Sequence, residues 1–280
     1  MELLQAKHQR VLGILREFER AVVAFSGGVD STLLAKLARD VLGRDRVLAV
    51  TADSPSLARE DLQDAIQVAR QLDLVHAVVR TAEVDDPAYQ ANARTRCYFC
   101  KQELFEVLGA LARERGIPVV LYGAIGDDRH EDRPGEQAAR ERGIRAPLQE
   151  AGLEKFDVRE LSRALGVPNW NRPQNACLSS RIPHGQEVTA EKLQRIESAE
   201  SFLRAQGFHQ VRVRHDGAHA RIEVGAEEVG RFADAQLRLG VTQAFERLGF
   251  ATVGVDRRGY RPGGAQQAAD EILLTAIGSC

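Results

Sequence analysis

The feature that most constrains the fold is the segment AVVAFSGGVDSTLL, residues 21–34, where a short apolar run meets a glycine-rich turn and then a helical pattern. Gly27 and Gly28 allow the backbone to turn tightly, so that its N–H groups can approach an anion. The N-terminus of the following helix adds the positive end of its dipole. A glycine pair alone is usually only a turn, but between a strand and a helix this string predicts a phosphate-binding loop.

The polar residues of this loop indicate which ligand it binds. Ser26, Ser31 and Thr32 can donate hydrogen bonds to phosphate oxygens. Asp30 would repel a phosphate unless a cation lay between them, which suggests Mg²⁺. No Gly-Lys-Ser/Thr follows the glycines, so the loop is not a Walker A motif. SGGVDS resembles instead the signature of the PP-loop pyrophosphatases, and this resemblance implies cleavage of ATP between its α and β phosphates.

Short apolar runs alternate with helical stretches through the first half of the chain. Strands separated by helices of this length imply right-handed crossovers, so we expect an α/β fold with a doubly wound parallel sheet and helices on both faces. The PP-loop resemblance implies the adenine nucleotide alpha hydrolase-like form of this fold. The expected strands are residues 21–25, 46–52, 75–80 and 119–124, and the expected helices include 33–43 and 58–72.

Two further loops follow strands of this sheet, on the side where open α/β sheets bind ligands. Asp53 belongs to the loop after the second strand and is placed to meet adenosine. Gly123 and Asp127 belong to GAIGDDRHEDRPG, in which Asp127 and Asp128 can hold a metal ion or a ribose. Taken alone, that stretch fits a solvated charged loop equally well.

An irregular segment rich in Pro, Asn and Ser, NWNRPQNACLSSRIP, is the expected boundary to a second domain. Beyond it, the pattern predicts a helix over 189–206, strands at 210–216 and 219–224 joined by a turn, helices over 226–248 and a strand at 251–256. This indicates a smaller α+β domain. The expected divisions are 1–172 for the PP-loop domain, 173–262 for substrate binding and sulfur transfer, and 263–280 for a tail of uncertain order.

Three cysteines have a spacing that indicates more than buried thiols. Cys97 and Cys100 form a C-x-x-C pair just before an expected amphipathic helix, and Cys177 lies in the boundary loop. The pair alone fits a redox dithiol, half of a zinc site or a structural role. Three thiolates on a [4Fe–4S] cluster would leave one iron open for sulfide or substrate. A zinc site completed by His184 or His130 would be closed and structural. Cys280, at the chain end, is expected to be disordered or incidental, and as a fourth ligand it would close the site.

Charged residues of the second domain suggest a phosphate site. Arg212 and Arg214 are two apart on an expected strand and therefore share a face, where paired guanidinium groups match a phosphate. An ordinary solvent-facing strand is the alternative. Ser180 and Arg181 add a hydroxyl and a cation to the loop that holds the third cysteine. Glu200, on the preceding helix, fits either a paired surface charge or a partner for these arginines.

Overall composition excludes several classes of protein. Lys and Arg number 38 against 40 Asp and Glu, so no net field attracts nucleic acid or an anionic membrane. No apolar run reaches the length of a membrane span. The first twenty residues describe an amphipathic helix and not a secretion signal. We therefore expect a cytoplasmic protein whose partners are small molecules.

Assembled, these segments resemble the LarE family, the sulfur-insertion enzymes of nickel-pincer nucleotide cofactor synthesis that supply lactate racemase. The resemblance runs from about Glu2 to Arg261, and ACLSSRIP is its most diagnostic block. Ile125 stands where the family commonly has Asn. The blocks that carry the resemblance are AVVAFSGGVDSTLL, TADSPSLARED, RCYFCKQELF, DDRHEDRPG, NACLSSRIPHG and VRVRHDGAHARIEV.

The resemblance implies an ATP-dependent sulfurtransferase that forms AMP and pyrophosphate. Its substrate would be pyridinium-3,5-biscarboxylic acid mononucleotide, whose carboxylates are adenylated with ATP and Mg²⁺ and then converted to thiocarboxylates. The three-cysteine pattern implies a [4Fe–4S] cluster that carries sulfide from an unknown donor, and the family suggests a homo-oligomer. Carried over by position, Arg212 and Arg214 would hold the substrate phosphate, with Ser180, Arg181 and Glu200 near the reacting end.

Three other functions compete with this interpretation. A cluster-dependent PP-loop tRNA thiolase should have a basic surface with aromatic platforms, whereas this chain has balanced charge and 5% aromatic residues. An amide-forming PP-loop synthetase would leave the cysteines unexplained. A nucleotide-binding regulatory module would bind ATP without turning it over.

Overall fold

A computed structural model of the chain describes residues 2–127, 134–173, 175–261, 264–266 and 270–274. Asp128, His130 and Cys280 lie outside these residues. The chain forms two compact units, each with its own sheet. Unit 1 comprises Met1–Tyr89 and Thr95–Asn175, and unit 2 comprises Gln90–Arg94 and Ala176–Cys280.

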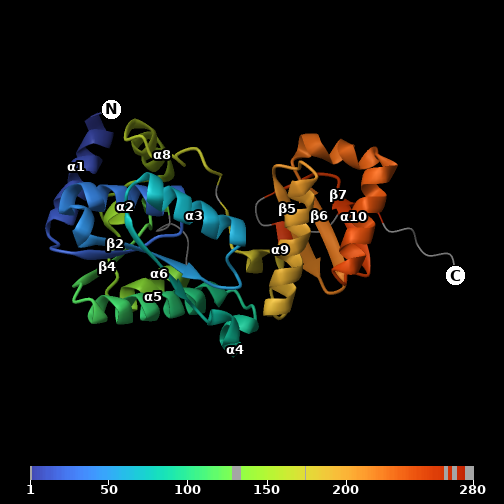
Figure 1. Ribbon diagram of the computed structural model, residues 1–280, viewed down its shortest axis with the longest axis horizontal. Helices are drawn as coiled ribbons and strands as arrows, with labels where there is room; N and C mark the ends of the chain where they lie inside the picture. Colours follow the sequence, from blue (N-terminus) through green and yellow to red (C-terminus); the bar gives the residue numbers. More distant parts are fainter. Residues whose placement is uncertain (1, 128–133, 174, 262–263, 267–269, 275–280) are drawn as a thin grey trace. The chain divides into compact units, whose positions relative to one another are not determined.

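The helices and strands of both units follow one another in the order shown by the colours of Figure 1. In unit 1 they are α1 (Glu2–Arg16), β1 (Ala21–Ala24), α2 (Val29–Leu42), β2 (Val47–Asp53), α3 (Arg59–Gln71), β3 (Val75–Arg80), α4 (Pro87–Gln90), α5 (Arg96–Glu114), β4 (Val119–Tyr122), α6 (Pro134–Glu141), α7 (Pro147–Glu150) and α8 (Lys155–Ala164). In unit 2 they are the 3₁₀ turn η4 (Leu178–Arg181), α9 (Ala190–Ala205), β5 (Val211–Asp216), β6 (His219–Val224), η5 (Ala226–Ala233), α10 (Ala235–Arg247), β7 (Thr252–Asp256) and β8 (Glu271–Leu273).

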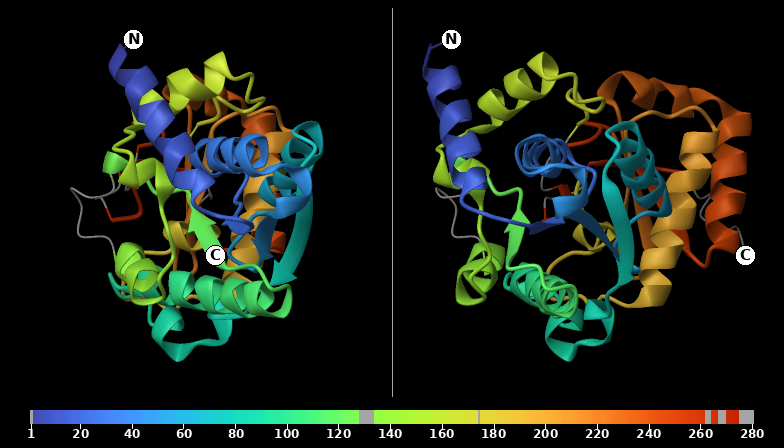
Figure 2. Two further views of the ribbon diagram at one scale, coloured as in Figure 1. Left: turned by 90° about the vertical axis from the view of Figure 1, so that its left-hand side faces the viewer. Right: turned by 60° about the vertical axis from the view of Figure 1, so that its left-hand side comes forward.

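The sheet of unit 1 is parallel, with strands in the order β3-β2-β1-β4. Alternate residues of β1 face two cores: Val23 packs with α1, α2, α3 and α8, whereas Val22 packs with α5 on the other face. Figures 1 and 2 show helices on both faces of this sheet. A strand covered on both faces must be continuously apolar, which is why AVVA carries no polar residue. The predicted doubly wound α/β fold is confirmed.

The strand order places a ligand crevice at the end of β1. The chain moves outward from β1 to β2 and β3, then returns to add β4 on the other side of β1. Beyond the carboxyl ends of strands at such a reversal, the loops separate and leave room for a ligand. Ser26 follows β1 and Gly123 follows β4, so both lie at this point.

Unit 2 contains a mixed sheet in the order β5-β6-β7-β8. The first two strands form the expected antiparallel hairpin, with Gly217 at φ 59°, and β7 runs parallel to β6. The segment 263–280, for which we expected uncertain order, contributes β8 antiparallel to β7. Glu271 at its start accepts a hydrogen bond of 2.7 Å from His219 Nε2, which helps to hold this strand at the sheet edge.

A short piece of the first half of the chain belongs to unit 2. Asn92 is fully buried, at φ 51°, and its Nδ2 donates to the carbonyl oxygens of Ile182, Pro183 and Gln186. The carbonyl of Gln90 accepts from the backbone N–H of Val188 at 2.9 Å. The chain therefore passes between the units at Tyr89–Gln90, Arg94–Thr95 and Asn175–Ala176.

His215 makes the stability of unit 2 dependent on pH. It is buried on the valine face of β5, where neither ring nitrogen has a hydrogen-bond partner among the described residues. Burial, followed by the charges of Arg195 and Lys192, lowers its pKa from 6.5 to about 4. The unfolded chain therefore binds the proton more readily, and this contribution to stability is complete above pH 6.5 and is lost as the pH falls towards 4.

We expect acidification from pH 7 to pH 4 to cost the wild type about 3 kcal/mol more than it costs a His215→Phe variant. Phenylalanine fits the neighbourhood because His215 already packs on Phe250, with ring centroids 5.3 Å apart. Urea denaturation at a series of pH values measures the difference. Equal losses in both proteins would show that His215 does not titrate in this way.

Candidate active site

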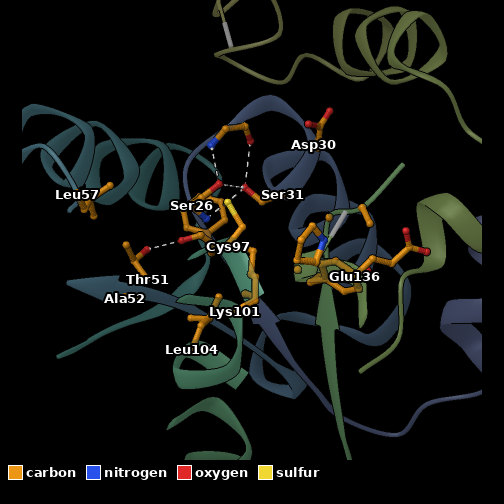
Figure 3. Close-up of a pocket in the computed structure, with 18 residues that line it drawn as sticks. Ser26, Asp30, Ser31, Thr51, Ala52, Leu57, Cys97, Lys101, Leu104 and Glu136 are labelled. Atoms are coloured by element: carbon orange, nitrogen blue, oxygen red, sulfur yellow. Dashed lines mark hydrogen bonds between the residues drawn. The ribbon is translucent and has the colours of Figure 1, made fainter. Parts of the chain in front are cut away.

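The predicted phosphate loop joins β1 to α2 and is held by its own hydrogen bonds (Figure 3). The Ser31 hydroxyl donates to the Gly28 carbonyl at 3.1 Å, so in the 3.0 Å contact between the two serine hydroxyls Ser26 is the donor. The N–H of Gly28 donates to Ser26 Oγ at 3.3 Å. Thr32 is fully buried and donates to Gly28 O at 2.8 Å, so in this structure its hydroxyl shapes the loop from within.

Residues that the sequence analysis did not identify fix this loop from outside. Asn169 Nδ2 donates to the Gly27 carbonyl at 2.7 Å, and Arg172 Nη1 donates to the same oxygen at 3.3 Å. Arg172 is itself held by Asp61 and Asp64 on α3. Asn169 and Arg172 both belong to the segment NWNR. The polar character of this segment is the only sequence feature that could have indicated their role.

Gly27 and Gly123 lie so close to the backbone of neighbouring segments that a side chain at either position would collide with it. Gly27 has φ 69°, and a Cβ built there would lie 2.8 Å from Ala65 Cα on α3. A Cβ on Gly123 would lie 2.8 Å from the backbone N of Ser31 and 3.0 Å from the carbonyl carbon of Asp30. The end of β4 therefore packs directly against the backbone of the phosphate loop.

A cavity of about 600 Å³ opens beside the loop, a volume suited to a nucleotide. The phosphate loop forms one wall, the ends of β2 and β4 form the base, and α5 and α6 supply the remainder (Figure 3). Its lining residues are Ala24, Phe25, Ser26, Gly28, Asp30, Ser31, Thr51, Ala52, Leu57, Cys97, Lys101, Leu104, Tyr122, Gly123, Ala124, Pro134, Gly135 and Glu136.

Three of the four predicted carboxylates of unit 1 lie in the described residues, and their surroundings differ. Asp30 lines the cavity, and both of its oxygens accept hydrogen bonds of 2.8 Å from Lys155 Nζ. Asp127 accepts from the backbone N–H of Lys155 at 3.2 Å, close to that pair. Asp53 pairs with Arg59 on α3 instead, and the cavity lining includes its neighbour Ala52.

Cys97 and Cys100 lie inside α5, one turn apart, and the expectation that they precede the helix is corrected. The helix begins at Arg96, so the pair shares a helix face and Cys97 reaches the cavity. Cys177 belongs to unit 2, where it is exposed and precedes η4. Cysteine thiolates are the donors that iron–sulfur clusters take. Among the residues that the structure describes, no three His, Cys, Asp or Glu side chains are grouped to hold a metal ion.

In unit 2, Arg181 and Glu200 form an ion pair that is almost completely buried. Arg181 Nε lies 2.9 Å from Glu200 Oε1, and Arg204 and the N–H of Val213 also donate to this carboxylate. The surface-charge alternative for Glu200 is therefore wrong, because its exposed fraction is 0%. Burial raises the pKa of Glu200, but the charge and hydrogen bond of Arg181 outweigh burial and lower the pKa overall.

The two predicted arginines of β5 lie on one face, next to this ion pair. Arg214 is buried and donates to Glu223 Oε2 at 2.7 and 3.0 Å and to the carbonyl of Ser180 at 3.2 Å. The Arg212 guanidinium lies over the Tyr260 ring at 5.2 Å, and burial, followed by the charge of Arg181, lowers its pKa. The solvent-facing alternative is wrong for Arg214, and Ser180, Arg181, Glu200, Arg212 and Arg214 form one cluster.

A parallel sheet whose first strand leads through SGGVDS into a helix, with a nucleotide-sized cavity at that turn, defines a PP-loop enzyme that uses ATP. A sequence model of the NAD synthase family matches residues 12–121. A part of the chain is also similar to the NH(3)-dependent NAD(+) synthetase of Methanococcoides burtonii, at 29% identity over 192 residues, 60% of this chain and 67% of that protein.

Two relatives match nearly the whole chain. The pyridinium-3,5-bisthiocarboxylic acid mononucleotide synthase of Lactiplantibacillus plantarum is 37% identical over 263 residues, 94% of this chain and 95% of that protein. An uncharacterized protein of Synechocystis sp. is 47% identical over 262 residues, 93% of this chain and 97% of its own length. The chain belongs to the LarE family, as its motifs predicted. In the described part of the chain, no helix is long and apolar enough to cross a membrane.

Gly123→Ala should weaken ATP binding at least about tenfold, because the added methyl group meets loop backbone, which cannot rotate away. Isothermal titration with ATP measures the loss. Gly109→Ala on α5 is the matched control: the nearest heavy atom is 3.5 Å away, at the flexible end of Arg113. Unchanged ATP affinity in Gly123→Ala would mean that the loop adjusts freely.

Proposed function

We propose that this chain is an ATP-dependent sulfurtransferase that adenylates the carboxylates of pyridinium-3,5-biscarboxylic acid mononucleotide and converts them to thiocarboxylates. The observation that carries the proposal is 37% identity, over 94% of the chain, to the enzyme named for the bisthiocarboxylic product. The phosphate loop and its adjoining cavity supply the ATP site that such a reaction needs.

Adenylation is needed because a carboxylate is a poor electrophile. A substrate carboxylate oxygen attacks the α phosphorus of ATP, the bond to the β-phosphate oxygen breaks, and pyrophosphate leaves. A sulfur nucleophile then forms a C–S bond at the mixed anhydride, and the C–O bond to AMP breaks. The serine hydroxyls and N–H groups of the loop are donors suited to the phosphates during the first step.

We assign the sulfur-carrying role to Cys97, Cys100 and Cys177, as ligands of a [4Fe–4S] cluster whose open iron would present sulfide. The chemistry of their side chains supports this assignment, because cysteine thiolates are the usual ligands of such clusters. Asp30 is the proposed Mg²⁺ ligand, since its carboxylate lies in the loop and already binds a cationic group.

In unit 2 we assign the substrate phosphate to Arg212 and Arg214, with Ser180, Arg181 and Glu200 around the reacting carboxylate. The group of charged residues in unit 2 supports this assignment, because ion pairs hold the guanidinium groups of Arg181 and Arg214. Arg212 and Arg214 share one face of β5. We further propose a cytoplasmic homo-oligomer that takes sulfide from a separate donor.

The direct test is pyrophosphate release by protein purified without oxygen. Release should follow addition of ATP with the pyridinium dicarboxylate nucleotide and not with tRNA, and the thiocarboxylate should be detected by mass spectrometry. Release with tRNA alone would establish a tRNA thiolase instead. The iron–sulfur assignment predicts a brown protein that contains iron and acid-labile sulfide, with broad absorption at about 400 nm. A colourless protein with one zinc ion would refute it.

A further inference from the structure

Lys155 holds the one carboxylate that the phosphate loop contributes to the cavity. Its Nζ lies 2.8 Å from both oxygens of Asp30, although the two residues are 125 positions apart in sequence. The lysine is the first residue of α8, and its backbone N–H donates to Asp127. A capping box formed by Glu154 and Asp157 fixes the start of this helix, so the lysine side chain leaves from a defined point.

This pair lies at the place where a triphosphate would arrive. Asp30 lines the cavity and stands apart from the bonded serine pair in Figure 3. Of the cavity's lining residues in the described part of the chain, Lys101 alone carries a permanent positive charge. The serine hydroxyls and backbone N–H groups are neutral donors. Lys155 would add a second permanent cation on the Asp30 side of the cavity.

The ion pair is well suited to exchange partners. The side chains of Lys155 and Asp30 are 29% and 28% exposed, and an ion pair open to water contributes little to stability. A phosphate group carries more charge than one carboxylate and offers more acceptor oxygens. Because a lysine ammonium is a mobile point charge on a flexible stem, it can change partner without movement of α8.

We propose that Lys155 is a binding residue for the β- and γ-phosphates of ATP, held on Asp30 until nucleotide arrives. On binding, its ammonium group transfers to the terminal phosphates, and the Asp30 carboxylate becomes available to the Mg²⁺ that accompanies ATP. The inference rests on the ATP use proposed above and adds the residue that selects a triphosphate over AMP.

Titration calorimetry with Lys155→Met tests the proposal. Affinity for ATP and for inorganic pyrophosphate should fall at least about tenfold, which is about 1.4 kcal/mol, while affinity for AMP changes less than about twofold. Lys155→Arg should retain most of the ATP affinity. Lys36→Met is the matched control, since Lys36 lies on α2 and makes a 2.8 Å pair with Asp40, outside the cavity lining.

A double variant separates phosphate binding from simple neutralisation of Asp30. If Lys155 only screens that carboxylate, Asp30→Asn combined with Lys155→Met should recover wild-type ATP affinity in the presence of EDTA. If Lys155 binds phosphate, the double variant stays weak. Recovery, or an unchanged ATP affinity in Lys155→Met, overturns the inference. Absence of ATP binding by the wild type would refute the proposed function itself.

Discussion

Replacement of Cys177 by alanine should abolish thiocarboxylate formation while the rate of pyrophosphate release in the first turnover stays within about threefold of the wild type. The reason is the division of roles between the units. The cavity beside the phosphate loop is lined by residues of unit 1. Cys177 belongs to unit 2, where it is exposed and directly precedes η4 in sequence. Loss of its thiol would remove the proposed sulfur-carrying group and leave the residues of the phosphate loop unchanged. Rapid-quench measurement of pyrophosphate, with mass spectrometry of the nucleotide product, gives both quantities.

Two companion variants distinguish a shared cluster from a single reactive thiol. If a [4Fe–4S] cluster carries the sulfide, Cys97→Ala and Cys100→Ala should lose bound iron and thiocarboxylate formation together with Cys177→Ala. If Cys177 acts alone, both companions should still form product. An equal loss of adenylation and sulfur insertion in Cys177→Ala would contradict the role given to this residue.

Glu200→Gln should lower the free energy of unfolding by about 3–5 kcal/mol, because it leaves the guanidinium of Arg181 buried without its anion. The effect should depend on pH. The pKa of Glu200 in the folded protein is lowered overall, so its contribution is present above the unfolded value of 4.5 and is lost as the pH falls through the folded pKa. Chemical denaturation of both proteins at pH 7 measures the loss of unfolding free energy. The same measurement at lower pH shows how far the difference between them shrinks.

Glu191→Gln on the same helix is the matched control. Glu191 pairs with Arg195 at 2.8 Å, but its side chain is 79% exposed, so its loss should cost less than about 1 kcal/mol. A similar cost for the two variants would mean that burial of the Arg181–Glu200 pair does not determine its energy. Retention of the fold in Glu200→Gln would also allow the proposed substrate-binding role of these charged residues of unit 2 to be assayed directly.

The sequence predicted those parts of the fold in which local pattern and tertiary packing agree. The apolar run at 21–24 must be buried on both sheet faces, and Gly27 must adopt positive φ, so strand, turn and helix follow from the residues themselves. Arg212 and Arg214 share a face because strand geometry requires it. Burial of Arg214 was not predictable, since it depends on Glu223, which enters from the neighbouring strand.

Other features depend on contacts between distant segments, which no local pattern records. Lys155 is one charged residue among many until the fold brings α8 to the phosphate loop. Asn169 lies in an irregular segment and gives no sign that its amide holds the Gly27 carbonyl. The start of α5 was predicted after Cys100, although the residues of the C-x-x-C pair are compatible with a helix and the helix begins at Arg96.

The excursion of Gln90–Arg94 into unit 2 bears on how the protein is made. The three carbonyl groups that satisfy the Asn92 amide belong to residues 182, 183 and 186, which leave the ribosome long after Asn92 itself. Until the later segment has been synthesised, water takes the place of these acceptors. A gene divided once after Asn175 would separate Asn92 from its acceptors, so the fragment that carries residues 176–280 would lack a segment of its own fold.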